Sequence, residues 1–315
     1  MAPLLFFLVL CVVPAGAAAS GVRVPATSAG EASQFWSAGR IRAAKPLEVT
    51  TSPSTALPQK GGGERGAPRR IAGVAPRRAD FGADFEQVAD PTAPGFRIHG
   101  AIFVSLGIFG YGRCSGTAVH SGNQSVVFTA GHCVNSGGKY GRWEKDRWTF
   151  IPAYRYGQRP FGAFPARWLD TTRQWRRSGS ENFDVGAAVV GRNQRGETLE
   201  EAVGGAGIAW NLKPKQTFAV HGYPAEEPFD GETQRICPAA PFIGHDPNSF
   251  FFPGPLNLAV NCEVTGGASG GGWIIDGETL NGVTDYGYFD DTSPDFGAYF
   301  GNEVARLYGR AAKVK

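Results

Sequence analysis

The chain has 315 residues, enough for one large domain or two small ones, and its 31 Lys and Arg against 28 Asp and Glu give a formal net charge of +3. The excess lies in the first 95 residues, which hold 10 basic and 7 acidic side chains, whereas residues 96–315 hold 21 of each. A domain that binds nucleic acid needs a basic face, so this neutral balance argues against a nucleic-acid partner.

Residues 1–19 have the pattern of an export signal. An uncharged apolar run at 4–13 is followed by Ala15, Ala17 and Ala19, whose spacing fits a signal-peptidase site. The run is far shorter than the roughly 20 apolar residues of a membrane span, and no other stretch is long and apolar enough. The alternative is a buried N-terminal helix, because no basic residue precedes the run. We predict that the protein is secreted and that its mature form has no contact with a membrane.

Residues 20–95 differ in composition from the rest of the chain. Pro, Ala, Gly and Ser dominate, and paired arginines stand at 69–70 and 77–78. The aromatic residues of this segment are Phe35, Trp36, Phe81 and Phe85. A segment with so little apolar surface is expected to be loosely structured by itself. We predict a low-complexity pro-segment that is removed on maturation; the alternative is a flexible linker that stays attached.

Residues 96–315 are dense in aromatic residues, and short apolar runs alternate with turns rich in Gly, Pro, Asn or Asp. This pattern predicts many short strands, which indicates an all-β barrel or sandwich. The expected strands are 101–106, 125–129, 185–190, 217–220, 256–260, 273–275 and 282–284. A single helix is expected at the C-terminus, capped by Asn302, with Val304, Leu307 and Tyr308 on its apolar face.

Cysteine usage agrees with export. Cys11 lies within the signal, and the remaining even number of cysteines suggests two disulfides in an exported chain. These cysteines are Cys114, Cys133, Cys237 and Cys262. Pairing those that are close in sequence would contribute about 3 kcal/mol per bridge, but all three pairings stay open at this point. A metal site is the competing interpretation. Because the chain has no C-x-x-C or H-x-x-x-H spacing, we expect no metal.

Three short motifs follow one another along the second part of the chain: TAGHC at 129–133, DVGA at 184–187 and GGASGG at 266–271. Taken singly, His132 is a core histidine, Asp184 a strand-start aspartate, and Ser269 part of a glycine turn. Taken together, they supply a base, a carboxylate and a nucleophile. A serine hydroxyl needs an imidazole to take its proton and a carboxylate to hold that imidazole in the useful tautomer. We therefore predict that His132, Asp184 and Ser269 are catalytic.

The glycine turn bears on the mechanism in a second way. A tight turn directs consecutive backbone N–H groups at one point, and we predict that the amides of Gly267 and Ser269 form an oxyanion hole. The same turn matches G-x-S-x-G, the nucleophile elbow of α/β-hydrolases, in which the histidine follows the serine along the chain. The histidines stand at 99, 120, 132, 221 and 245. None follows Ser269, which excludes a lipase or esterase of that fold.

With its motifs in this order, the chain resembles the trypsin-like serine proteases of the chymotrypsin fold, in particular the secreted bacterial branch that includes the glutamyl endopeptidases. The resemblance covers residues 100–315 and includes HGYP at 221–224 and the segment around the serine, 262–271. It implies two antiparallel six-stranded β-barrels with a short C-terminal helix, and a triad in the cleft between the barrels. It also implies the disulfides Cys114–Cys133 and Cys237–Cys262. Residues 96–315 are then the protease domain.

Two departures from the family pattern matter for regulation and specificity. Animal relatives carry an aspartate just before the serine, where it pairs with the new N-terminus on activation, and here that residue is Ala268. Latency must then come from the pro-segment or not at all. Glutamyl endopeptidases have a histidine in the strand that lines the substrate pocket. The matching stretch, 282–287, has none, so glutamate specificity loses its main support.

The substrate pocket is assigned from the same resemblance. Glu263 lies six residues before Ser269, an ungapped match to the pocket-floor acid of trypsin, and such an acid favours Arg or Lys side chains. Thr284 and Asp285, on the pocket strand, complete the predicted pocket. The alternative is that Glu263 points elsewhere or pairs with an arginine.

These observations predict a secreted serine endopeptidase that hydrolyses peptide bonds through an acyl-enzyme intermediate. Its partners are protein or peptide substrates, it needs no cofactor, and we expect a monomer. The alternative is a catalytically silent binding protein with a protease fold. Such relatives have usually lost a triad residue, whereas all three are present here.

Overall fold

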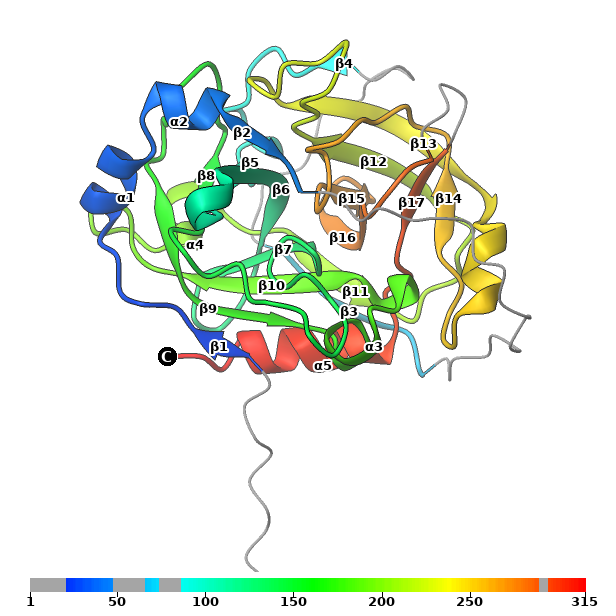
Figure 1. Ribbon diagram of the computed structural model, residues 1–315. Coiled ribbons are helices and arrows are strands. Elements are labelled where there is room, and N and C mark those ends of the chain that lie inside the picture. The colour runs from blue at the N-terminus through cyan, green and yellow to red at the C-terminus, as the bar shows by residue number, and fades with distance from the viewer. Residues whose placement is uncertain (1–20, 48–65, 74–85, 289–293) are drawn as a thin grey trace, which may run out of the picture.

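The computed structural model describes residues 21–47, 66–73, 86–288 and 294–315. Strands dominate these residues and form two sheets, and helix α5 (Asn302–Ala311) runs along the lower edge of the molecule in Figure 1. The predicted all-β class with a C-terminal helix is confirmed. The expected signal at 1–19 and the arginine pair at 77–78 lie outside the described residues. None of the described helices has the length and apolar composition needed to cross a membrane.

Six strands of the first sheet close into an antiparallel barrel, because β8 pairs with both β5 and β9. In chain order they are β5 (His99–Ser105), β6 (Tyr111–Val119), β7 (Val126–Ala130), β8 (Thr149–Pro152), β9 (Phe164–Thr171) and β10 (Val185–Val190). Every residue of β10 is buried, which explains its uninterrupted apolar sequence VGAAVV. The barrel ring thus brings the ends of β7 and β10 together, with Ala130 opposite Val185.

The second sheet has the strand order β17-β14-β13-β12-β15-β16-β11. Its strands are β11 (Gly207–Trp210), β12 (Thr217–Gly222), β13 (Arg235–His245), β14 (Leu258–Val260), β15 (Gly272–Ile275), β16 (Thr279–Val283) and β17 (Asp295–Gly297). Neighbours are antiparallel except β11 and β16, which run parallel. The turn before β15 carries Ser269, so this sheet presents the predicted nucleophile toward the barrel.

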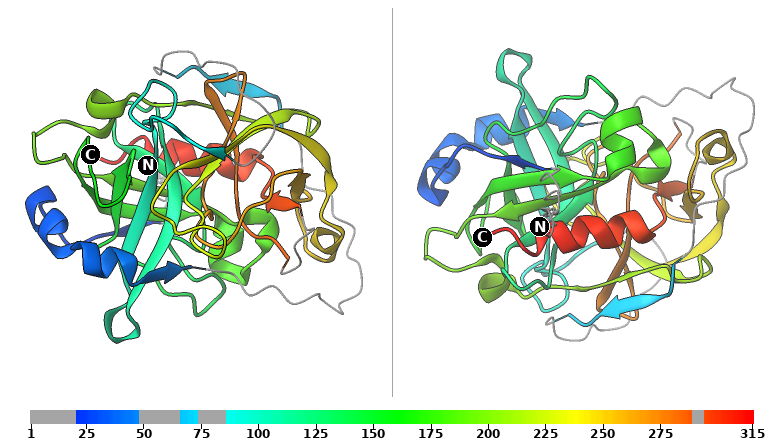
Figure 2. Two further views of the ribbon diagram at one scale, coloured as in Figure 1. Left: turned by 90° about the horizontal axis from the view of Figure 1, so that it is seen from above. Right: turned by 90° about the horizontal axis from the view of Figure 1, so that it is seen from below.

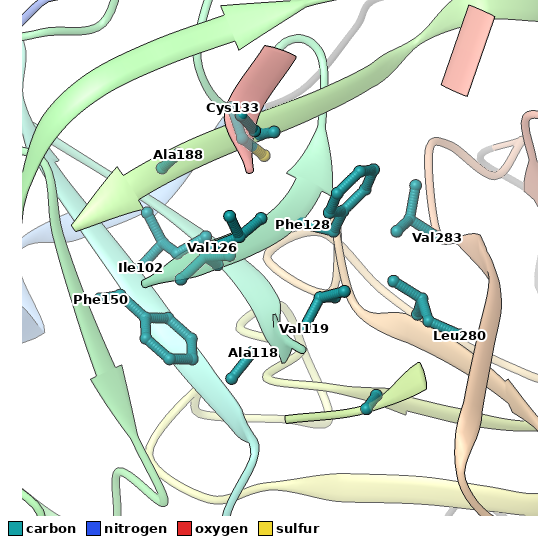
Figure 3. Close-up of a cluster of buried hydrophobic side chains, with 14 of the residues drawn as sticks. Ile102, Ala118, Val119, Val126, Phe128, Cys133, Phe150, Ala188, Leu280 and Val283 are labelled. Carbon is teal, nitrogen blue, oxygen red and sulfur yellow. The ribbon is translucent and has the colours of Figure 1, made fainter. Parts of the chain in front are cut away.

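One hydrophobic core is shared by the barrel and the second sheet. Its barrel side includes Val119 and Phe128, and its other side includes Leu280 and Val283 of β16; all four are buried. Figure 3 shows these side chains facing one another across the junction. Because the two sheets share this packing, the residues on either side of the junction are held in a fixed relation.

Each strand expected from the sequence overlaps an observed strand, but several strands were missed. The longest, β13, contains Pro238 and Pro241, which interrupt a strand pattern because proline cannot donate a ladder hydrogen bond. The expected cap at Asn302 is wrong: Gly301 is the cap, and the side-chain oxygen of Asn302 accepts a hydrogen bond from the amide of Asn211 at 2.8 Å. The expectation of a single helix is also wrong.

The additional helices are short, which is why no long apolar period marks them. Within residues 96–315 they are α3 (Arg173–Ser178) and α4 (Leu199–Val203), with the 3₁₀ turns η1 (Gly107–Phe109), η2 (Glu181–Phe183) and η3 (Pro247–Phe251). Both α-helices have threonine caps, Thr172 and Thr198, whose side-chain oxygens accept from the amides three residues on. The η2 turn leads directly into Asp184.

Residues 22–47 of the N-terminal segment pack on the barrel, a contact that their composition did not predict. Their elements are β1 (Val22–Arg23), α1 (Ala29–Phe35), α2 (Ala38–Arg42) and β2 (Ala44–Pro46). Trp36 is completely buried, and its indole Nε1 donates to Arg147 O at 3.0 Å. Figures 1 and 2 show α1 and α2 against the barrel on the side away from the second sheet. A few apolar residues suffice here because the barrel supplies the rest of the cluster.

Two further pieces of the same segment pair with the second sheet. Strand β3 (Arg69–Ile71) lies antiparallel to β11, and β4 (Glu86–Gln87) lies antiparallel to β13. The side chain of Arg70 forms an ion pair with Asp276 at 2.7 Å. The described parts of the first 95 residues therefore contact both halves of the molecule.

Candidate active site

His132 and Asp184 meet because their strands are paired. His132 follows β7 by two residues and Asp184 precedes β10 by one, and these two strand ends are neighbours in the barrel. Nδ1 of His132 lies 2.7 Å from Oδ2 of Asp184, and the backbone N–H of His132 donates to Oδ1 at 2.7 Å. Both side chains are buried. The carboxylate thus fixes the ring orientation and favours a proton on Nδ1, which leaves Nε2 with its lone pair.

The turn that carries Ser269 packs directly against the histidine segment. The carbonyl oxygen of Ser269 accepts the backbone N–H of Ser115 at 2.8 Å and lies 3.7 Å from Sγ of Cys133, the residue after His132. At Gly270 a Cβ atom would stand 2.0 Å from Oγ1 of Thr129, so a side chain there would push the two segments apart. The structure therefore brings the serine and histidine motifs into contact.

Nε2 of His132 is buried and has no hydrogen-bond partner among the described residues. The ring nitrogen that a catalytic base uses is therefore free, and no hydrogen bond joins it to the hydroxyl of Ser269. Catalytic hydrogen bonds are often long or poorly aligned until substrate is bound. The arrangement is consistent with an imidazole that accepts a proton from a group in the adjacent turn.

The peptide planes of the glycine turn direct two amides outward. Gly266 O accepts the backbone N–H of Ala225 at 2.7 Å, and Ala268 O accepts that of Gly271 at 2.8 Å. In a trans peptide the N–H points opposite to the C=O, so the amides of Gly267 and Ser269 point away from these contacts. Neither amide has a hydrogen-bond partner in the described part of the chain. Gly267 has φ +94°, a conformation that glycine adopts without strain.

Both disulfides implied by the family resemblance are present. Cys114 is bonded to Cys133 and Cys237 to Cys262. The first bridge ties β6 to the segment that follows His132. The sulfur atoms of Cys114 and Cys133 and a ring nitrogen of His132 lie within 4.8 Å of one another. Because both sulfurs are in the disulfide, this group offers no thiolate ligand to a metal.

The residues predicted for the substrate pocket divide into two groups. Thr284 lies beside the nucleophile turn: its N–H donates to Gly271 O at 2.9 Å, and its carbonyl accepts from Gly270 N at 2.6 Å. Asp285 follows it and is buried, with Oδ2 accepting the backbone N–H of Ala298. Glu263, by contrast, is exposed, and no hydrogen bond or ion pair joins its carboxylate to the described residues.

Two acids near the site were missed from the sequence. Oδ2 of Asp295 accepts the hydroxyl of Thr284 at 2.8 Å, and Oδ1 of Asp295 has no partner among the described residues. Glu181 lies in the turn before Asp184. No motif marks either residue, because Asp295 comes from a distant strand and Glu181 from a short 3₁₀ turn. The available signal for Glu181 was only its position three residues before Asp184, and the sequence offered none for Asp295.

Burial controls the charge of these acids. It raises the pKa of Asp285 well above its usual range, and the nearby charge of Asp184 raises it further. Burial likewise raises the pKa of Asp295, although the hydroxyl of Thr284 opposes the shift. The pKa of Glu181 rises to about 7, from burial first and then from Asp184 and Asp246. Burial thus shifts Asp285 and Asp295, the two acids next to the Thr284 segment, toward their neutral forms.

Comparison with known proteins places this arrangement in a family. No protein-family model and no curated protein sequence matches the chain. Among solved structures, the protease Anisep from Arthrobacter nicotinovorans is 34% identical, with a TM-score of 0.63 over 69% of this chain and 96% of that one. The thermostable serine protease AL20 from an extremophilic microorganism is 32% identical, with a TM-score of 0.63 over 70% of this chain and 98% of that one.

The chain belongs to the serine proteases of the chymotrypsin fold. A Glu endopeptidase is also similar, with a TM-score of 0.57 over 75% of this chain and 100% of that one, but at 15% identity this likeness shows the fold alone. The relation to serine proteases predicted from the motifs is confirmed. The narrower relation to glutamyl endopeptidases has only this weak support.

Proposed function

We propose that the protein is a secreted serine endopeptidase that hydrolyses peptide bonds through an acyl-enzyme intermediate. The observation that carries this proposal is the buried His132–Asp184 pair, whose free Nε2 adjoins the turn bearing Ser269. His132 takes the proton of the Ser269 hydroxyl and later returns it to the leaving amine, while Asp184 orients the imidazole and stabilises its charged form. The amides of Gly267 and Ser269 stabilise the oxyanion. No cofactor is required.

The same site indicates which residues line the substrate pocket. Thr284 and Asp285 border the nucleophile turn, which supports their assignment to the substrate pocket. The exposure of Glu263 does not support a pocket-floor role. We expect the enzyme to act as a monomer on protein or peptide substrates. Two disulfides in a protease fold agree with an oxidising, extracellular location.

Covalent labelling tests the proposed function. A fluorophosphonate reagent reacts with a serine hydroxyl only where a neighbouring base activates it, so the full chain in its active form is expected to take up one label, mapped by mass spectrometry to Ser269. The Ser269→Ala variant should remain unlabelled. A wild-type protein that folds and takes up no label, either intact or after proteolytic removal of residues 20–95, would contradict the proposal and favour the silent binding protein.

We further propose that residues 20–95 form a pro-segment that limits activity before removal. Strand β2 adds to the part of β6 that β7 does not cover, and Leu47 N donates to Arg113 O at 3.0 Å. Two residues further along β6, about 7 Å away, Ser115 contacts the carbonyl of Ser269. An extended substrate needs free strand edge beside the nucleophile, and this edge is occupied by the chain itself.

A proline substitution tests whether residues 20–47 block the substrate edge of β6 or only pack on the barrel. Leu47→Pro removes the N–H that binds Arg113 and is expected to raise the initial rate of the intact full-length protein on a short peptide by on the order of tenfold. Val24→Pro is the matched control, because it removes the equivalent bond from Val24 N to Arg167 O, at 2.9 Å in the barrel away from β2. Equal rates for the two variants would contradict the blocking role.

A further inference from the structure

We infer that Ser115 is a positioning residue for the reaction, because its hydroxyl fixes the turn that binds the oxyanion. This inference rests on the proposed protease function. Ser115 lies within β6, next to Cys114, and is 1% exposed. Among the described residues no hydrogen bond joins its side chain to His132 or Asp184, and none of the three sequence motifs includes it.

The hydroxyl of Ser115 links two backbone segments that meet at the site. Its Oγ donates to Gly267 O at 2.9 Å and accepts the backbone N–H of Tyr223 at 2.9 Å. A serine hydroxyl has one proton to donate and lone pairs to accept, and both capacities are used here. The side chain therefore connects the nucleophile turn to the segment that follows β12.

The backbone of Ser115 holds the same turn at a second point. Its N–H donates to Ser269 O at 2.8 Å, and its carbonyl accepts the hydroxyl of Thr129 at 2.8 Å. One residue thus binds the carbonyls of Gly267 and Ser269, the two residues whose amides we assign to the oxyanion. These bonds tie the position of the amides to the barrel strand that also carries the Cys114–Cys133 bridge.

The turn needs this restraint because Gly267 is intrinsically free to rotate. Glycine adopts φ values of either sign at little cost, so nothing in the residue itself maintains φ +94°. The two peptide groups flanking Gly267 are held from outside: Ala225 N binds Gly266 O on one side, and Ser115 Oγ binds Gly267 O on the other. Without the hydroxyl, Gly267 O loses its partner, and the peptide group after Gly267 keeps only the hydrogen bond from Ala268 N to Thr265 O at 3.2 Å. One of the restraints on the backbone on either side of Gly267 is then lost.

Ser115→Ala removes the hydroxyl while leaving the backbone contacts. We expect kcat on peptide substrates to fall by about 10- to 100-fold, because a small misplacement of an oxyanion donor has effects of that size. KM should stay within about twofold, since substrate binding does not use this group. The affinity for a peptide aldehyde, which forms a tetrahedral adduct with the serine, should fall by the same factor as kcat.

Ser121→Ala is the matched control. Ser121 is also 1% exposed, and its hydroxyl donates a hydrogen bond to Asn123 Oδ1 at 2.9 Å, but it lies beyond the far end of β6. Its substitution loses one hydrogen bond, where Ser115→Ala loses two. It should leave kcat and aldehyde affinity unchanged. Ser115→Thr, which keeps the hydroxyl, should retain most of the wild-type kcat even if thermal stability falls.

The outcomes distinguish this inference from the proposed function. If the wild type is active and Ser115→Ala has an unchanged kcat, the positioning role alone is overturned. It is also overturned if Ser115→Ala lowers Tm but leaves the aldehyde affinity unchanged. Equal losses in Ser115→Ala and Ser115→Thr would also overturn it, because the hydroxyl would then be irrelevant. A wild type that neither hydrolyses peptides nor reacts with fluorophosphonate would overturn the proposed function and this inference with it.

Discussion

Replacing Ser269 with alanine is expected to lower kcat for peptide hydrolysis by on the order of 10⁶-fold, because no other described group in the turn is a comparable nucleophile. The hydroxyl of Ser269 makes no hydrogen bond within the described residues, so its removal leaves no buried partner unsatisfied. The variant should therefore fold normally. Hydrolysis of casein or of a mixed peptide pool measures the activity, and thermal unfolding measures the stability.

The stability of Ser269→Ala decides how its loss of activity is interpreted. Equal Tm values for wild type and Ser269→Ala would attribute the lost activity to chemistry rather than to unfolding. Wild-type hydrolysis by the variant would overturn the assignment of the nucleophile. Ser121→Ala again serves as a control, because it removes a buried hydroxyl at a distance from the site.

Asp184→Asn is expected to lower kcat by about 10⁴-fold with little change in structure. The carboxylate of Asp184 accepts both the backbone N–H and the ring Nδ1–H of His132. An amide retains one acceptor but presents an NH₂ group in place of the second, which favours the tautomer with the proton on Nε2. That tautomer cannot take a proton from the serine. Single-turnover kinetics on an activated peptide ester measures the effect.

Asp170→Asn is the matched control for this substitution. Asp170 is equally buried on the barrel, and its carboxylate pairs with Arg310 at 2.6 Å. Weakening a buried ion pair lowers stability, so Tm should fall while kcat is retained. A similar loss of kcat in both variants would show that Asp184 acts only through stability, contrary to the proposed role.

The sequence predicted the parts of the site that depend on local motifs. His132, Asp184 and Ser269 each stand beside a strand or turn that is visible in the sequence, and their order along the chain selects one fold among those using a serine nucleophile. The disulfide pairing followed from the family resemblance and is confirmed. The order of the motifs could not predict the contacts between segments that lie far apart in sequence.

Glu263 illustrates this limit. Its spacing from Ser269 matches a pocket acid, but spacing does not determine the direction of a side chain on an irregular segment, and the residue is exposed. The acids that do lie beneath the turn come from elsewhere: Asp295 binds Thr284 across two strands, and Asp285 is buried beside it. The backbone pairing of Phe296 with Asp285 and Tyr286, and that of the pocket strand with the nucleophile turn, bring these groups together.

The N-terminal segment shows a second limit, which concerns composition. Residues 20–95 are poor in apolar side chains, and composition alone predicts disorder. Trp36 and Ile41 are nevertheless buried against Phe103 and Tyr154 of the barrel. Composition measures whether a segment can form its own core, whereas this segment completes the core of a neighbour.

The burial of Trp36 bears on what removal of the proposed pro-segment would require. Cutting the chain after Leu47 would remove the covalent tether but not the indole from its site, where burial of a tryptophan contributes about 3–5 kcal/mol. Departure would also expose Ala101, Phe103 and Ile151, now covered by the segment. Maturation would then yield a nicked, two-chain complex, in which a freed peptide competes with substrate at a concentration-dependent equilibrium. Dilution would thereby become a step in switching the enzyme on.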